Sequence, residues 1–155
     1  MKLQFDPNLP FQREAIDAVV NIFKGQEVCR TNFTVAPLKQ MEGLFAGIDQ
    51  SDLGVGNRLR LLDDEILKNV QDIQLRNALA QSQALGSMDF TVEMETGTGK
   101  TYVYLRTIFE LNSKYGFTKF IIVVPSVAIK EGVHKSLQMT EEHFKGLYDL
   151  SLIHI

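Results

Sequence analysis

A chain of 155 residues that is 45% hydrophobic and 23% charged has the composition of an ordinary globular domain, which excludes disorder throughout. Its formal net charge of −3 supplies no overall basic field, so any nucleic-acid contact must depend on a local surface. The single cysteine, Cys29, excludes an internal disulfide and fits a reducing compartment. The longest apolar run, residues 120–124, is too short to span a bilayer, and no leader-like segment follows Met1.

The first expected element is a helix over residues 10–24, because its apolar side chains recur at helical spacing. Pro10 suits a first helical position, and Gly25 suits a C-terminal stop. Residues 31–57 lose this period and collect glycines, which indicates a long irregular connection with a short strand at residues 33–35. Nothing in this connection indicates a function.

A second helix is expected over residues 61–79, where apolar side chains repeat along one face. That face carries Leu62, Ile66, Val70, Ile73 and Asn77. The acidic residues 63–65 suit its first turn, where the helix dipole favours negative charge. We expect the other charges to form a solvated face.

The most informative part of the chain begins with an alternating, strand-like pattern over residues 88–94 and continues into residues 94–101, METGTGKT. Glycines allow a tight turn here, so that backbone N–H groups converge on a phosphate at the start of the next helix. We expect that helix over residues 99–115. Its inward residues should be Val103, Ile108 and Leu111. The motif predicts a nucleoside-triphosphate binder.

The residues of this loop have separate expected roles. Lys100 should reach the β- and γ-phosphates as a point charge, and the Thr101 hydroxyl should supply one ligand to the bridging Mg²⁺, which makes both candidates for catalysis. The residues expected to hold the triphosphate are Thr96, Gly97, Thr98, Gly99, Lys100 and Thr101. Met94 stands where the full pattern has a first glycine, a variant familiar from helicase-like motors.

After this helix, the β-branched run at residues 120–124 predicts a strand buried on both faces. Strand, loop, helix and strand form a βαβ unit, in which the two strands are parallel and the loop lies at the carboxyl end of the first. The predicted fold class is therefore α/β. Ser126 should cap a further helix to about residue 137, and Thr140 another over residues 141–147.

Together with residues 11–15 (FQREA) and 123–133 (VVPSVAIKEGV), the loop resembles the start of the restriction (Res) subunits of type III restriction-modification systems. The resemblance covers about residues 9–148. It implies a P-loop NTPase domain of RecA-like fold from helicase superfamily two, a parallel sheet with flanking helices that is incomplete here. It also implies a cytoplasmic, ATP- and Mg²⁺-dependent DNA motor and endonuclease without a membrane partner. Its partners would be double-stranded DNA and a modification methyltransferase subunit.

The resemblance assigns roles to further residues. Gln12 would read the adenine edge, because a side-chain amide both donates and accepts; the alternative is an exposed glutamine at a helix start. Pro125 and Ser126 match the region that contacts the DNA backbone in these motors, with ordinary helix capping as the alternative. Glu95 agrees with the restriction family, and we expect its carboxylate to turn away from the phosphates.

By the same resemblance, residues 1–149 form the amino-terminal part of the first motor domain. The acidic Mg²⁺-binding motif, the arginine finger and the nuclease domain of such subunits have no counterpart here. We therefore expect an amino-terminal fragment that binds nucleotide weakly and does not cleave DNA by itself. Residues 150–155 resemble a translated sequencing adapter, which would make them a scar outside the fold; the alternative is a real terminal strand.

Two other functions stay open at this stage. A small phosphotransferase with a phosphate-binding loop should have an arginine-rich lid, although only Arg106 follows the loop. A non-catalytic nucleotide-binding module is the second alternative. The histidines lack partners at metal-ligand spacing, so we expect surface positions for all of them. These are His134, His143 and His154.

Overall fold

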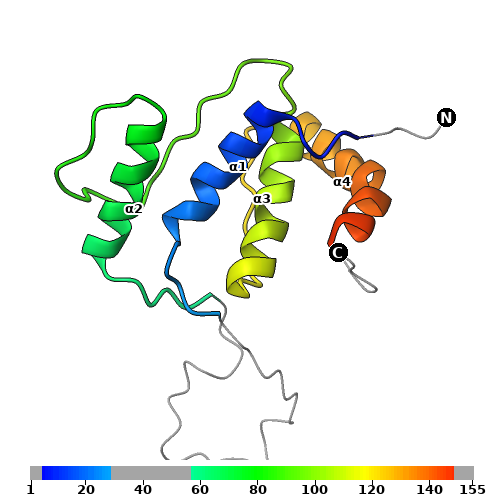
Figure 1. The fold of residues 1–155 in the computed structure, drawn as a ribbon. Helices are drawn as coiled ribbons and strands as arrows, with labels where there is room; N and C mark the ends of the chain where they lie inside the picture. Colours follow the sequence, from blue (N-terminus) through cyan, green and yellow to red (C-terminus); the bar gives the residue numbers. More distant parts are fainter. Residues whose placement is uncertain (1–4, 29–56, 149–155) are drawn as a thin grey trace, which may run out of the picture.

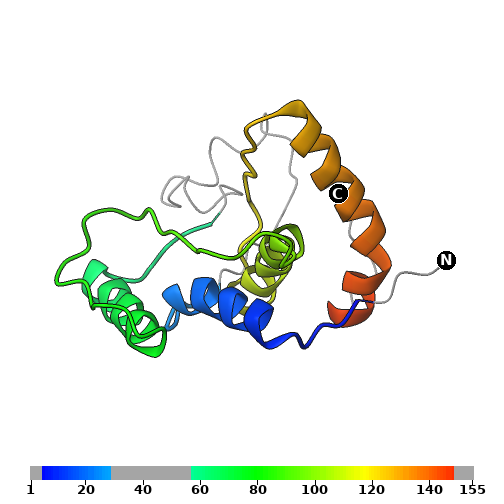
Figure 2. The ribbon, with the colours of Figure 1, turned by 90° about the horizontal axis from the view of Figure 1, so that it is seen from above.

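The computed structural model describes residues 5–28 and 57–148, which form four helices (Figure 1). In chain order these are α1 (Pro10–Ile22), α2 (Asp63–Arg76), α3 (Lys100–Tyr115) and α4 (Val127–Tyr148). α1 packs against both α2 and α3, and α3 also packs against α4. The helices therefore stand in the spatial order α2, α1, α3, α4, as both ribbon views show (Figures 1 and 2).

The hydrophobic core lies mainly between α1 and α3. Its buried side chains are Ile16, Val20, Val103, Leu111, Tyr115 and Phe117. The Tyr115 hydroxyl donates to the Val20 carbonyl oxygen at 3.1 Å, which satisfies its polar end inside the core. This packing fixes the start of α3 beside the start of α1.

α2 is held on the C-terminal end of α1 by a side-chain cap. The Asn69 amide donates to the carbonyl oxygens of Ile22 and Lys24, at 3.0 and 2.8 Å. These carbonyls have no partner within α1, so the contact supplies bonds that a helix end otherwise lacks. Ile66 is fully buried, whereas Leu62, which we expected on the same inward face, is 66% exposed.

The helices predicted over residues 10–24, 61–79 and 99–115 are confirmed, with ends a few residues shorter. The two final helices are a single one, because α4 continues through the position where Thr140 was expected to cap. Thr140 is buried, and its hydroxyl donates at 2.8 Å to the Ser136 carbonyl oxygen one turn earlier. A threonine that bonds back within the helix leaves the following N–H groups to the helix itself.

The predicted α/β fold with a parallel sheet is wrong for the described residues, which contain helices and no strand. Residues 88–94 and 120–124 run as irregular segments outside any sheet. Ile121 and Val123 are 90% and 88% exposed, the opposite of a strand buried on both faces. Their β-branched side chains favour extended backbone, but a strand also needs a neighbour to complete its hydrogen bonds, and the described residues supply none here.

Just before residue 120, the backbone is held by hydrogen bonds to a side chain and, among the described residues, not by a neighbouring strand. The Asn57 amide donates to the Lys119 carbonyl oxygen at 2.6 Å, and its Oδ1 accepts from the N–H groups of Thr118 and Lys119. Phe120 and Met94 are partly buried against the core. Each irregular segment is thus anchored at one end by a contact that does not require a sheet.

The strand expected at residues 33–35 and the proposed scar at residues 150–155 lie outside the described residues. Among the helices that the structure describes, none is both long and apolar enough to cross a membrane.

Candidate phosphate-binding loop

The chain turns sharply between Glu95 and the first residue of α3, and glycines make this turn possible. Gly97 and Gly99 both have φ of +84°, in the left-handed region that side chains with a Cβ disfavour. Gly99 is the N-terminal cap residue of α3, and its carbonyl oxygen accepts from the Val103 N–H at 3.0 Å. The tight turn into a helix start, expected from the sequence, is present.

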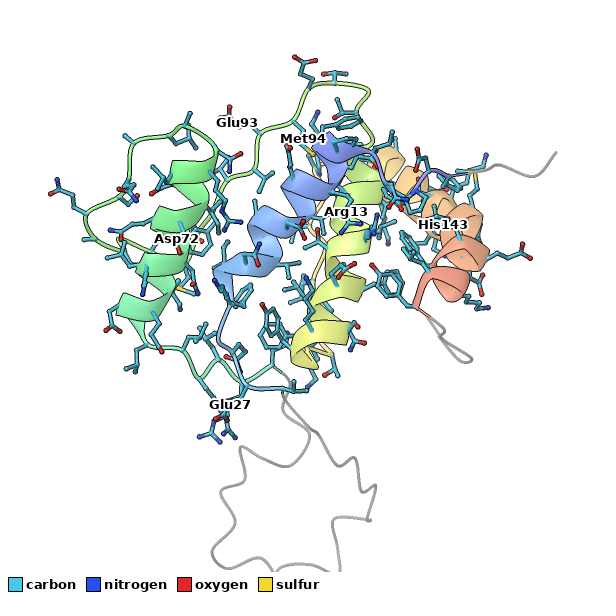
Figure 3. All side chains as sticks on the ribbon, in the orientation of Figure 1. Arg13, Glu27, Asp72, Glu93, Met94 and His143 are labelled. Atoms are coloured by element: carbon cyan, nitrogen blue, oxygen red, sulfur yellow. The ribbon has the colours of Figure 1, made fainter. Side chains whose placement is uncertain are left out.

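The loop lies on the surface, above the adjoining ends of α1 and α3 (Figure 1). Glu93 and Met94 mark the segment that rises toward it (Figure 3). Thr96, Gly97, Gly99 and Lys100 are exposed, while Thr98 and Thr101 are half-buried. Backbone N–H groups at the start of a helix that faces solvent are available to an anion.

Lys100 lies back across the loop. Its Nζ donates to the Glu95 carbonyl oxygen at 2.6 Å, and the Thr98 hydroxyl donates to the same oxygen at 2.6 Å. Glu95 therefore meets the lysine through its backbone carbonyl, and its side chain is exposed. The ammonium group lies at the mouth of the turn, where an incoming phosphate would compete for it.

Gln12 reaches the loop from α1. It is only 8% exposed, and its Nε2 donates to the Thr98 carbonyl oxygen at 2.8 Å. The alternative of an exposed glutamine at a helix start is therefore wrong. Its amide lies so close to the turn that a Cβ placed on Gly99 would come within 2.7 Å of Nε2. The structure thus brings together Gln12 and residues 95–101.

A hollow of about 400 Å³, which we call the α1–α2 hollow, lies elsewhere. It is lined by α1, α2 and the segment 79–92, with Ala18, Val70 and Phe90 among its apolar members. Its lining includes Asp89 but no lysine or arginine. A triphosphate needs cations and free N–H donors, so the open loop suits it and this apolar space does not.

The sequence of residues 8–148 matches the family model described as "Type III restriction enzyme, res subunit". The chain belongs to this family. It is 35% identical to the EcoPI Res subunit of Escherichia phage P1 over 150 residues, and 35% identical to the EcoP15I Res subunit of Escherichia coli over 153 residues. These alignments cover 94% and 95% of the chain but 14% of each relative. The StyLTI Res subunit of Salmonella typhimurium is 44% identical over 75 residues, 47% of the chain and 8% of the relative.

Membership in the Res family confirms the resemblance drawn from the loop and from residues 123–133, and it favours a restriction-system component over a small phosphotransferase. The chain spans about one seventh of the length of the first two relatives.

Pro125 and Ser126 stand apart from the loop, at the exposed start of α4 (Figure 2). The Ser126 Oγ accepts from the Ile129 N–H at 3.3 Å, and the Ser126 carbonyl oxygen accepts from Lys130 N–H at 3.1 Å. This is ordinary capping of a helix N-terminus. Capping explains why serine stands here in this Res-family chain, and a role in DNA contact stays a proposal.

The expectation that all three histidines lie on the surface holds only in part for His143, which is half-buried. Its Nε2 lies 2.9 Å from the Tyr102 hydroxyl, and its ring packs against Phe5 and Phe144. Burial lowers the pKa of His143, and the nearby Arg106 cation lowers that pKa further. His143 thus links α4 to Tyr102, the residue that follows Thr101 in α3. His134 is exposed, and His154 lies outside the described residues.

Arg106 is the residue near the site that sequence reasoning missed. It is 5% exposed, and its Nη1 donates to the Pro7 carbonyl oxygen. Arg106 and Glu110 are four residues apart, the spacing of an ordinary ion pair on the solvated face of a helix. The sequence therefore gives no sign that Arg106 is buried. In the described part of this Res-family chain, no group of three histidine, cysteine or acidic side chains is arranged to hold a metal ion.

Proposed function

We propose that this chain supplies the nucleotide-binding half of an ATP-dependent DNA motor in a type III restriction system. The observation that carries the proposal is the glycine turn at the start of α3, where the Lys100 ammonium and the Gln12 amide converge on one exposed loop. Convergent N–H groups, a helix N-terminus and a lysine form the recurring protein site for nucleotide phosphates.

Lys100 and Gln12 now bond to the loop itself, and a nucleotide would exchange these contacts. The Lys100 ammonium would leave the neutral Glu95 carbonyl oxygen for a phosphate oxygen, because a bond between two charged groups is the stronger one. The Gln12 amide would turn from Thr98 toward the adenine edge. Mg²⁺ would take the Thr101 hydroxyl as one ligand and phosphate oxygens as others.

Roles that need a longer protein belong to the same proposal. We assign residues 1–149 to the amino-terminal part of the first motor domain. Pro125 and Ser126 would touch the DNA backbone, and ATP hydrolysis and DNA cleavage would belong to the whole Res protein acting in the cytoplasm with a modification methyltransferase. The family match supports this assignment.

The test is a titration of this chain with a fluorescent ATP analogue and Mg²⁺. Lys100→Ala should weaken binding about tenfold to a hundredfold, the effect of removing a hydrogen bond between charged groups. Lys114→Ala, at the other end of α3, is the matched control and should bind as the native chain does. Equal affinity of the native chain and Lys100→Ala would contradict the proposal.

A further inference from the structure

Arg106 is a buried cation that the loop chemistry does not use. It lies on α3, six residues after Lys100, and its side chain is 6% exposed. Taking a guanidinium group out of water is costly unless its contacts compensate. An apolar side chain would fill this space at a lower cost, so the contacts of Arg106 must account for an arginine at this position.

The main contact of Arg106 joins it to the segment that precedes α1. Its Nη1 donates to the carbonyl oxygen of Pro7, 99 residues away in the sequence. Its Nε lies 3.9 Å from the Glu110 carboxylate and has no hydrogen-bond partner. Tyr102 and Tyr148 also lie beside the guanidinium group, but the bond to Pro7 is the contact that ties α3 to the segment before α1.

From Pro7 to Gln12 the chain is short and restricted. Leu9 is the N-cap of α1, and its carbonyl oxygen accepts from the N–H groups of Gln12 and Arg13 at 3.1 and 3.0 Å. Pro10 fixes φ at the first helical position, and it also limits the backbone of Leu9. A displacement of Pro7 would therefore shift the first turn of α1.

The other end of this segment is held at the loop, where Gln12 donates to the Thr98 carbonyl oxygen at 2.8 Å. Segment 7–12 is thus fastened to α3 twice, by Arg106 in its second turn and by the loop at its start. Figure 3 shows this segment crossing the start of α3, with Arg13 labelled just beyond it.

We propose that Arg106 is a positioning residue of the nucleotide site, which holds the segment before α1 and thereby sets the Gln12 amide against the loop. The consequence for nucleotide rests on the proposed function above. The consequence for the Gln12 amide does not, because it is a property of the chain without ligand.

The first experiment follows the side-chain amide signal of Gln12 by NMR in the chain without nucleotide. Arg106→Met keeps the volume and removes the donor, so the signal should move toward the position of a solvent-exposed glutamine. Arg106→Lys, which keeps a cationic donor, should restore part of the native shift. Lys114→Ala removes the other cation near Glu110, at 3.8 Å, and should leave the signal in place.

An unchanged Gln12 signal in folded Arg106→Met would overturn the inference. If Arg106→Met does not fold, Arg106→Leu is the second variant, because it also removes the donor and leaves the segment before α1 intact. The Gln12 signal should move in that variant too, and a native signal there would equally overturn the inference.

The second experiment compares fluorescent ATP and GTP analogues. Gln12→Ala should reduce the preference for ATP about fivefold, the effect of one hydrogen bond, and Arg106→Met should reduce it in the same direction. The double variant should be no worse than Gln12→Ala alone, because Arg106 acts through Gln12. Effects that multiply would overturn the inference. If the native chain binds neither analogue, the proposed function fails, and the amide signal still decides the role of Arg106.

Discussion

Gly99 carries two constraints at the residue scale, whereas Gly97 carries one. Both have φ of +84°, but a Cβ on Gly97 would meet open space. A Cβ on Gly99 would displace the Gln12 amide from its bond to Thr98. Substitutions at the two glycines therefore distinguish two contributions to the free energy of unfolding: the left-handed backbone, which both share, and the contact with Gln12 of α1, which only Gly99 has.

Gly97→Ala should lower the free energy of unfolding by about 1 kcal/mol, because of its left-handed backbone. Gly99→Ala should cost about 1 kcal/mol more, the contribution of the lost Gln12 hydrogen bond. Urea unfolding measures both. In a Gln12→Ala background the two substitutions should cost the same, and a difference that persists there would contradict the contact.

At the scale of elements, α3 and α4 are joined by a titratable contact. The half-buried His143 ring packs against Tyr102 of α3, Phe5 and Phe144, and the Arg106 cation of α3 is close enough to act on its charge. Burial raises the pKa of Tyr102, so its hydroxyl keeps its proton, and in the tautomer with the imidazole proton on Nδ1 the His143 Nε2 accepts a hydrogen bond from that hydroxyl. Protonated His143 would lose this acceptor and face the Arg106 cation.

Because the pKa of His143 is lowered in the folded state, the unfolded chain takes up this proton first as pH falls. The contribution of His143 to stability should be complete above its ordinary pKa of about 6.5 and should decline as pH falls through the lowered value. His143→Phe should remove this decline in the melting temperature measured between pH 7.5 and 5. His134→Phe, an exposed position on the same helix, should retain it, and a native decline in His143→Phe would contradict the coupling.

The elements that sequence predicted well depend on local pattern. The apolar period of α1 and α3, and the glycines of the loop, specify their conformations within a few residues. The prediction of strands was wrong for a physical reason. Apolar alternation at residues 88–94 and β-branched side chains at residues 120–124 indicate only a preference for extended backbone, whereas strand pairing depends on residues far away in the sequence. Arg106 was missed for the same reason, since its burial depends on Pro7, 99 residues earlier.

At the scale of the whole molecule, the helices supply most of the core, and residues 121–123 lie outside it with exposed side chains. Ile121 is 90% exposed, whereas Ile66 of α2 is fully buried. Ile121→Ala should change the free energy of unfolding by less than about 0.5 kcal/mol, as at other exposed sites. Ile66→Ala should cost about 2–5 kcal/mol, as in other cores. A comparable cost at both sites, measured by urea unfolding, would show that residues 120–124 are buried in solution.

The arrangement of the molecule also leaves two places that differ in chemistry, the open loop at the start of α3 and the apolar α1–α2 hollow. Under the proposed function a nucleotide would bind by its phosphates at the first, where the Lys100 ammonium and the backbone N–H groups at the start of α3 lie.

The most direct test is to follow the backbone N–H and Gln12 side-chain NMR signals of the whole chain as Mg²⁺ and ATP are added, with AMP as the control. ATP should shift the signals of residues 95–101 and Gln12, and AMP should shift them far less, since it lacks the β- and γ-phosphates. ATP-induced shifts confined to the lining of the α1–α2 hollow, or equal shifts with ATP and AMP, would contradict a phosphate-binding loop.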